Sequence, residues 1–291
     1  YLESRTDEVS TDTLKSHQYR LSHLVRWANN EGIESIDQLD PRNLYKYRQW
    51  RKRDGDLNNV SLHTQMSTLR VFLKWAGRMQ FVDEGLYEAV DVPSLDDGED
   101  QRDEKMSEET AQNILRYLDR YEYASAEHVI IRLIWRVGMR IGAVNSIDVD
   151  DYKPQKRTLK VVHRPEGGTS LKKKHNGERT VALNHRTCDI LNDYIDVNRQ
   201  DVYDKHNRRP LLTTTEGRMS KSTIRRKIYR VTQPCLWMNE CPHDRTMDTC
   251  EDIGYSGTRG CPSSLNPHAI RRGAITRFLR ENKPVKAIED R

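Results

Sequence analysis

Apolar side chains in the first 92 residues recur every three or four positions, the spacing of an amphipathic helix. A helix predicted over about 11–30 carries three leucines on one face: Leu14, Leu21 and Leu24. Asp40 and Pro41 predict the start of a second helix, because aspartate caps backbone N–H groups and proline suits the first helical turn. A third helix is predicted over about 61–78. The pattern therefore indicates a helical first domain, residues 1–92.

The pattern changes twice in the rest of the chain. Residues 93–106 have almost no apolar content and predict a linker. A nearly continuous apolar run over 128–137 predicts a buried helix, which Gly138 ends. The remaining predicted elements are two strands around a lysine-rich connection, 158–163 and 179–183, and helices at about 187–198, 220–232 and 268–281. Residues 107–291 should therefore form a second, α+β domain, in a chain that is mainly helical overall.

The length of the chain agrees with this division into two domains, and the distribution of charge indicates a kind of binding partner. At about one domain per ~150 residues, 291 residues predict two domains. The formal net charge of +5 divides into −1 over residues 1–92, −6 over 93–110 and +12 over 111–291. A cationic second domain favours a polyanion as partner, and a solvated basic surface is the alternative. No apolar run approaches the ~20 residues of a membrane helix, so no membrane contact is expected.

Basic side chains on the helices of the first domain and in the lysine-rich connection are candidate phosphate contacts. Lysine and arginine neutralise phosphates and fix the register of a protein on a duplex without reading its bases. Solvation alone is the alternative explanation. The candidates are Arg42, Lys46, Arg51, Arg70, Lys74, Lys172 and Lys173.

Three motifs in the second domain are each common, but they are much less common together. The segment GMRIG (138–142) puts an arginine where the buried helix ends, a place where it meets an anion or caps carbonyls. The run KKK (172–174) lies in the strand-to-strand connection, where a solvated turn is the alternative. The segment HAIR (268–271) places an imidazole and a guanidinium one turn apart on a helix.

In this order the motifs resemble the tyrosine recombinase (phage integrase) family, over nearly the whole chain. GMRIGAVNSIDVDD is similar to the family's first-arginine motif, KHNGERTVAL to its β-hairpin motif and NPHAIRRGAIT to its H-x-x-R box. The resemblance implies four catalytic residues, with Lys173 as the alternative lysine: Arg140, Lys174, His268 and Arg271.

The resemblance also implies a fold and a set of domains. Residues 1–92 would be a helical core-binding (SAM-like) domain and residues 93–106 an acidic linker. Residues 107–291 would be the α+β catalytic domain of the DNA breaking-rejoining enzymes, with a small antiparallel sheet. The acid-rich linker and the cysteines resemble archaeal members of the family.

The implied activity is site-specific recombination of double-stranded DNA through a covalent 3′-phosphotyrosyl intermediate, by a tetramer on DNA and without a required cofactor. Two arginines suit the charged oxygens of the transition state, because their forks are bidentate and permanently charged. A lysine can protonate the departing deoxyribose oxygen, and a histidine that titrates near neutrality can assist proton transfer at the nucleophile.

The sequence departs from the family pattern in three places. Ala143 stands where relatives often carry glutamate, and Arg272 where many carry a second histidine. The family's nucleophilic tyrosine and its sixth catalytic residue follow the H-x-x-R helix, but Arg291 is only 20 residues beyond Arg271 and no tyrosine occupies that place. We therefore expect a fragment, incomplete at the C-terminus of its catalytic domain, that binds DNA without cleaving it.

Two alternatives belong to other classes of protein. A DNA-binding protein without strand-transfer activity, such as a decayed integrase or a regulator, is compatible with the missing tyrosine. A zinc-dependent nuclease ranks last, because no set of carboxylate and histidine ligands accompanies Lys174 and Arg271.

Four of the five cysteines lie in a segment of about 235–262, which reads as an insertion in the catalytic domain. With a nearby histidine they could supply a Cys3His zinc site: Cys235, Cys241, His243, Cys250 and Cys261. The spacing lacks paired C-x-x-C motifs, and small buried hydrophobes are the alternative. An odd number of cysteines without a signal-peptide pattern favours a reducing cytoplasm.

Overall fold

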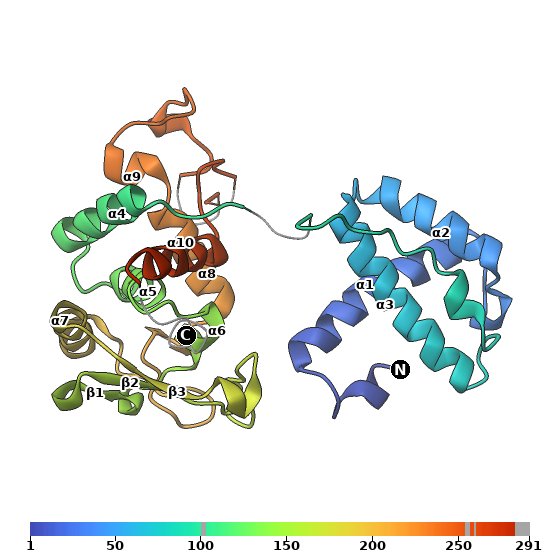
Figure 1. The fold of residues 1–291 in the computed structure, drawn as a ribbon, viewed down its shortest axis with the longest axis horizontal. Helices are drawn as coiled ribbons and strands as arrows, with labels where there is room; N and C mark the ends of the chain where they lie inside the picture. Colours follow the sequence, from blue (N-terminus) through green and yellow to red (C-terminus); the bar gives the residue numbers. More distant parts are fainter. Residues whose placement is uncertain (100–102, 254–256, 259, 283–291) are drawn as a thin grey trace. The chain divides into compact units, whose positions relative to one another are not determined.

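The computed structural model describes residues 1–99, 103–253, 257, 258 and 260–282. The chain divides into two compact units, Tyr1–Asp103 and Glu104–Arg291, which are coloured in chain order in Figure 1. We describe each by itself, as the N-terminal unit and the C-terminal unit.

The N-terminal unit is built from three helices: α1 (Thr11–Asn30), α2 (Pro41–Asp54) and α3 (Asn59–Arg78). Each begins at a side chain that accepts a backbone N–H from the first helical turn: Ser10, Asp40 and Asn58. Their apolar faces enclose Trp27, Tyr47 and Leu73, which are at most 2% exposed. A short 3₁₀ turn, η3 (Leu86–Ala89), packs against α3. The three helices predicted from the apolar spacing are confirmed.

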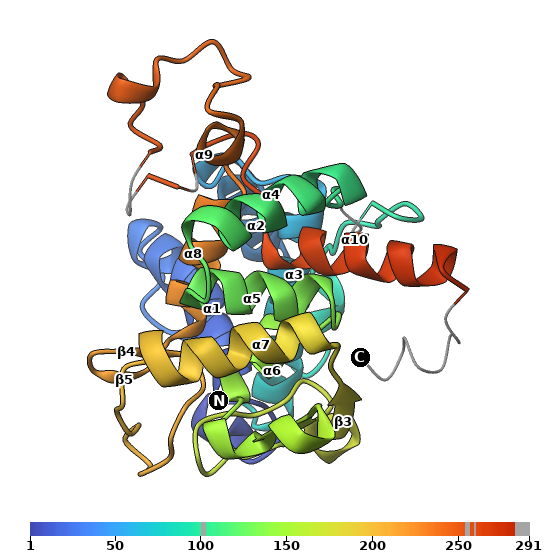
Figure 2. The same cartoon turned by 90° about the vertical axis from the view of Figure 1, so that its left-hand side faces the viewer.

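The helices of the C-terminal unit surround α5 (Ala126–Trp135), every residue of which from Glu127 to Trp135 is buried. The others are α4 (Glu108–Tyr121), α6 (Ile141–Ser146), α7 (His185–Asp193), α8 (Lys221–Val231), α9 (Pro234–Met238) and α10 (Pro267–Arg280). Helix α5 contacts α4, α7, α8 and α10, and Figure 2 shows it between α4 and α7. It is the centre of the core of this unit.

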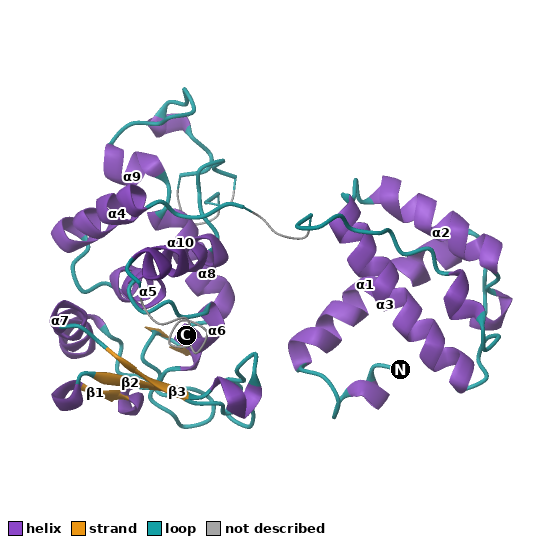
Figure 3. Cartoon of the chain, in the orientation of Figure 1, coloured by secondary structure: helices purple, strands orange, loops and turns teal. Residues whose placement is uncertain are grey.

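A three-stranded antiparallel sheet lies beside α7, at one end of the C-terminal unit (Figure 3). Its strands are β1 (Tyr152–Lys153), β2 (Thr158–Val161) and β3 (Arg179–Ala182), in the order β1-β2-β3. Leu159 pairs with Val181 and Val161 with Arg179. A second, two-stranded sheet of β4 (Thr213–Thr214) and β5 (Gly217–Arg218), not predicted from the sequence, adds a short hairpin.

The predicted fold class, a helical domain followed by an α+β domain with a small antiparallel sheet, is confirmed. The buried helix is less apolar than its sequence pattern suggested. Within α5, His128 and Arg132 are buried. Their burial is tolerated because Arg132 donates to His128 Nε2 at 3.2 Å and to Asp119 Oδ2 at 3.0 Å. Across the described ranges, no helix is both long and apolar enough to cross a bilayer.

Candidate active site

Arg140 stands at the junction of two helices. Helix α5 ends in a turn in which Gly138 has a φ of +77° and Met139 N–H donates to Leu133 O at 3.2 Å. Glycine suits this left-handed position, which reverses the chain after a helix. Arg140 is then the N-cap residue of α6 and is half-buried. The turn thus places Arg140 between the buried helix α5 and the start of α6, where its side chain is partly accessible to solvent.

His268 and Arg271 lie in the first turn and a half of α10. Asn266 caps this helix, its Oδ1 accepting from the backbone N–H groups of His268 at 2.9 Å and of Ala269 at 3.0 Å. Positions three apart share one face of a helix, so the imidazole and the guanidinium point the same way. His268 is exposed, whereas Arg271 is only 7% exposed.

The pKa of His268 is lowered from its ordinary value of 6.5. Partial burial is the largest cause, followed by the positive charges of Arg272, Lys172, Arg271 and Arg140. Four cations from α6, α10 and the β2–β3 connection therefore lie within electrostatic reach of one imidazole. Segments more than 120 residues apart in sequence meet here.

The pKa of Arg271 is lowered to about 10, first by burial and then by the neighbouring Arg140 and Arg179. Arg179 is the first residue of β3, and its Nη1 donates to Gly177 O at 2.8 Å. Side chains alternate along a strand, so Arg179 shares the face of Val181, which is 5% exposed in the core. We did not predict Arg179; its place two residues before a core valine was the available signal.

We refer to Arg140, Lys172, Arg179, His268 and Arg271 as the cationic site. Both pKa shifts in it are caused by burial and by other cations. A bound anion would relieve this repulsion, and guanidinium forks match the geometry of phosphate oxygens. The arrangement can therefore hold a phosphate and stabilise further negative charge on it.

The lysine run lies in the connection between β2 and β3. Lys172, Lys173 and Lys174 are all exposed, and Lys174 begins a 3₁₀ turn (Lys174–Gly177) with a φ of +51°. Lys172 is the lysine whose charge acts on His268. The structure thus places Lys172, expected to contact DNA, within electrostatic reach of the imidazole, and the predicted proton donor Lys174 at the start of the exposed 3₁₀ turn.

The predicted phosphate contacts of the N-terminal unit fall into two groups. Arg42 and Lys46 are exposed on α2, as expected. Arg51 is instead 4% exposed, with Nε donating to Gln65 Oε1 at 2.8 Å and Nη1 paired with Asp54 at 3.3 Å. Its prediction as a DNA contact was wrong for this conformation, because its guanidinium bonds α2 to α3.

Two other predicted contacts brace the segment after α3. Arg70 Nη2 donates to Val90 O at 2.6 Å, and Lys74 Nζ lies 5.4 Å from the centre of the Tyr87 ring.

Sequence reasoning missed a groove of about 510 Å³ between α1 and α3, whose lining includes Lys15 and Arg20. Isolated positions on two helices gave no signal for this groove.

The end of the linker lies along α10. Met106 N–H donates to Ala269 O at 3.0 Å, Arg272 Nε donates to Glu104 O at 3.1 Å, and Asn266 Nδ2 donates to Glu104 Oε2 at 2.8 Å. A Cβ on Gly273 would lie 2.2 Å from Met106 O, so this close passage needs a glycine. Arg272 is thus a linker contact.

The cysteine-rich segment does not form the predicted zinc site. Among the residues that the structure describes, no three His, Cys, Asp or Glu side chains gather to hold a metal ion. His243 Nε2 instead hydrogen-bonds with Ser263 Oγ at 2.9 Å. Burial, then nearby Cys261 and Cys241, raise the pKa of the Cys235 thiol. Within the described residues the thiols therefore affect one another electrostatically without forming a metal-ligand cluster.

Two family models match the chain. The "Phage integrase, N-terminal SAM-like domain" matches residues 1–80, and the "Phage integrase family" matches residues 104–236. Two curated relatives each match 97% of this chain and 82% of their own length. They are the tyrosine recombinase XerC of Actinobacillus succinogenes, 18% identical over 282 residues, and that of Haemophilus influenzae, 19% identical over 285 residues.

Solved structures have a similar fold. The Tn1549 transposon integrase in complex with a circular intermediate DNA gives a TM-score of 0.68 at 14% identity, over 98% of this chain and 87% of that one. A lambda integrase dimer bound to a core site gives 0.64 at 12% identity, over 99% and 89%. These likenesses show the fold, and the two family models, which match residues 1–80 and 104–236, show that the chain belongs to the tyrosine recombinase (phage integrase) family.

Proposed function

We propose that this chain carries the DNA-binding and phosphate-activating parts of a site-specific recombinase, which cuts and rejoins double-stranded DNA. The observation that carries the proposal is the cationic site, in which three arginines, a histidine and a lysine from separate segments lie within electrostatic reach of one another. Family membership supplies the reaction, transfer of a DNA phosphoryl group to a tyrosine and back. The similar integrases bound to DNA support duplex DNA as the partner.

In the proposed reaction Arg140 and Arg271 bind the non-bridging oxygens of the scissile phosphate. The tyrosine oxygen attacks phosphorus, the bond to the 5′-oxygen of the next nucleotide breaks, and a 3′-phosphotyrosyl ester remains. His268 accepts or relays the tyrosine proton, because partial burial and then the surrounding cations lower the pKa of the imidazole and favour its neutral form. A lysine, for which we retain Lys174, protonates the departing 5′-oxygen. No cofactor is consumed, because the ester conserves the energy of the broken bond.

We also propose that a polypeptide of residues 1–291 binds DNA without cleaving it. No tyrosine follows Tyr255 in this sequence, and the nucleophile of the family lies beyond the H-x-x-R helix. This property also fits the second candidate function, a DNA-binding protein without strand transfer. A covalent adduct between this polypeptide and a nicked DNA substrate would contradict the proposal.

Three finer proposals concern assembly, source and location. We propose a tetramer on DNA, since recombination joins two duplexes and lambda integrase has been solved as a tetramer on a Holliday junction. We propose an archaeal source from the acid-rich linker and cysteines, although the two XerC relatives are bacterial. A cytoplasmic location fits both a DNA substrate and five free thiols.

The test uses the full-length encoded protein and a nicked duplex whose site has been selected by binding from random sequences. We expect a denaturant-resistant protein–DNA adduct from the wild type. Arg140→Ala should form none while the Kd for DNA rises less than about tenfold, because most binding comes from other phosphate contacts. Arg186→Ala, which removes an arginine paired with Asp119 away from the cationic site, is the matched control and should retain cleavage.

Two results would contradict the proposal. Binding by the wild-type protein without any adduct would favour the second function, a DNA-binding protein that transfers no strand. Loss of DNA binding in Arg140→Ala, with the fold intact, would assign that arginine to gripping DNA rather than to the reaction.

A further inference from the structure

The connection between β2 and β3, residues 162–178, is a folded loop with a defined base. Arg164 and Thr169 exchange two backbone hydrogen bonds, of 3.2 and 2.9 Å. Gly168, with a φ of +70°, closes the turn between them. Leu171 N–H then donates to His163 Nδ1 at 2.9 Å, directly before the lysine run. The position of this base therefore decides where the lysines lie.

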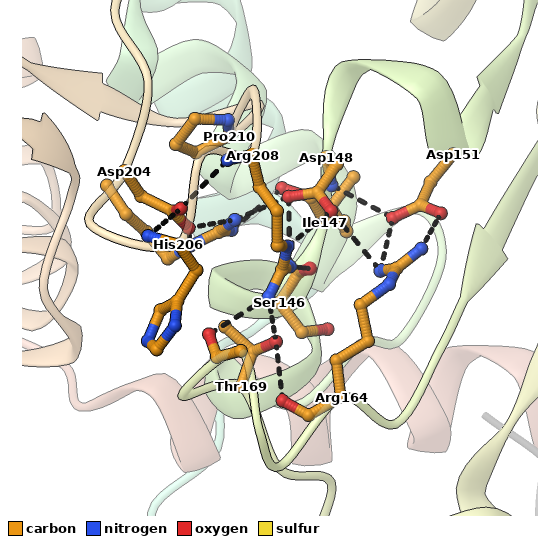
Figure 4. A network of polar contacts seen from close by, with 12 residues as sticks. Ser146, Ile147, Asp148, Asp151, Arg164, Thr169, Asp204, His206, Arg208 and Pro210 are labelled. Atoms are coloured by element: carbon orange, nitrogen blue, oxygen red, sulfur yellow. Dashed lines mark hydrogen bonds and ion pairs between the residues drawn. The ribbon is translucent and has the colours of Figure 1, made fainter.

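Arg164 attaches this base to the segment that follows α6. Its Nη1 donates to Asp151 Oδ2 at 2.9 Å and its Nη2 to Asp151 Oδ1 at 2.6 Å, a bidentate pair. Its Nη1 also lies 3.4 Å from Asp148 Oδ2. Figure 4 shows the guanidinium of Arg164 directed at both carboxylates.

Arg208 connects the same loop to the same helix. It forms two contacts with Asp148, Nε to Oδ2 at 2.9 Å and Nη2 to Oδ1 at 3.0 Å. Its Nη1 donates to Gly167 O and to Thr169 Oγ1, both at 2.9 Å, and its Nη2 to Ser146 O at 3.2 Å (Figure 4). One guanidinium thus holds the turn of the loop and the last residue of α6 together.

Arg218 completes the set from β5. Its Nη1 donates to Asn145 O at 2.9 Å and to Ile147 O at 3.1 Å, satisfying carbonyls at the C-terminal end of α6. The same side chain pairs with Asp148, and with Asp204 at 2.8 Å. Helix α6 is therefore fixed at the end opposite to Arg140.

We call these six residues the Asp–Arg network: Asp148, Asp151, Asp204, Arg164, Arg208 and Arg218. Three carboxylates balance three guanidiniums, and the carboxylate side chains are 5–10% exposed. Charges this buried are tolerated only when they are paired and hydrogen-bonded. The network therefore favours one arrangement of the loop against α6.

We propose that Arg164 is a positioning residue for strand cleavage: through Asp148 and Asp151 it fixes the lysine-bearing loop relative to α6, whose N-cap residue is Arg140. The inference rests on the proposed function, because it needs a lysine that protonates the leaving oxygen. Arg164 itself does not touch the phosphate. It sets the distance between the proton donor and an arginine that holds the phosphate.

This role predicts a defect that depends on the leaving group. A loop that shifts moves the lysine away from the 5′-oxygen, and displacements near 1 Å cost rate factors of about 10². When sulfur replaces that bridging oxygen, the departing group is a thiolate, which is far less basic than an alkoxide and leaves without a proton. A substrate with a 5′-bridging phosphorothiolate should therefore restore the cleavage rate of a variant whose lysine is displaced.

The experiment measures single-turnover cleavage by the full-length encoded protein at saturating DNA, on the ordinary substrate and on the phosphorothiolate one. Arg164→Met should cleave the ordinary substrate about tenfold or more slowly, and the sulfur substrate within about threefold of wild type. Lys174→Ala should show the same pattern, and Arg164→Lys, which keeps the charge without the fork, a milder one. Arg186→Met, which removes another arginine ion-paired in this unit, is the matched control and should be normal on both substrates.

The possible results distinguish a failure of the role proposed for Arg164 from a failure of the proposed function. If Arg164→Met is slowed equally on both substrates while Lys174→Ala is rescued, the inference fails and the proposed function stands. If the wild type cleaves neither substrate, the proposed function fails and the inference with it. Should Arg164→Met not fold, Arg164→Lys decides by the same comparison, because a slowing that sulfur does not relieve overturns the inference.

Discussion

The C-terminal unit contains two clusters of wholly or partly buried arginines whose electrostatic surroundings are opposite. In the Asp–Arg network, hydrogen bonding to Asp151 is the largest cause of a raised pKa for Arg164. In the cationic site, burial and neighbouring cations lower the pKa of Arg271 to about 10. The charge of the same side chain is thus balanced by carboxylates in one place and opposed by neighbouring cations in the other. A buried arginine indicates a ligand site only where its neighbours oppose its charge.

The largest effect is expected when the ion pairs of the Asp–Arg network are broken. Asp148→Ala leaves Arg208 and Arg218 buried without their shared carboxylate, so the free energy of unfolding should fall by about 3–5 kcal/mol. Urea unfolding of residues 1–291 measures it. Asp148→Asn, which keeps an acceptor of the same shape, should lose less. A loss below about 1 kcal/mol for Asp148→Ala would mean that the network contributes little to stability.

The intermediate effect concerns the cationic site. Arg271→Met removes a charge that Arg140 and Arg179 oppose, so in the same urea experiment we expect a smaller loss of stability than for Asp148→Ala. Sulfate, a phosphate-like anion, should raise the melting temperature of the wild type more than that of this variant. Destabilisation comparable with that of Asp148→Ala would remove the contrast between the clusters.

The smallest effect is a dependence on pH. The pKa of His268 in the fold lies below 6.5, so the unfolded chain binds more protons as pH falls through 6.5. The contribution of His268 to stability is therefore complete above pH 6.5 and is lost below it. When the pH is lowered from 7 to 5, the urea midpoint of the wild type should fall further than that of His268→Gln. Parallel midpoints would show that burial and the neighbouring cations do not lower the pKa of this imidazole.

The buried His128 does not disturb this comparison. Burial is the largest cause that lowers its pKa, to about 4, and it titrates in the same direction. Both proteins carry His128, so its contribution cancels in the difference between them.

Local patterns predicted most of the fold and part of the site. Helices α1, α2 and α10 follow from apolar spacing and from their capping residues, all of which are near in sequence. His268 and Arg271 share a helix face for the same reason. Each of these features depends on residues within one or two helical turns.

The missed features depend on distant partners. Arg51 is buried because Gln65, on another helix, accepts its hydrogen bond. Arg179 points to the core through the register of β2 with β3. The Asp–Arg network joins residues up to 70 positions apart. A single sequence contains these side chains but does not show which of them meet, because that follows from packing.

The contact of the linker with α10 affects how this protein can be divided into exchangeable modules. Glu104 and Met106 hydrogen-bond the helix of His268, so by contact they belong to the catalytic module although the acidic composition continues through them. A chimaera that receives a foreign DNA-gripping domain should keep its own chain from Glu104 onward. A junction at Ser107 would replace the segment that lies against Gly273, and with it the hydrogen bonds that hold the N-terminal end of α10.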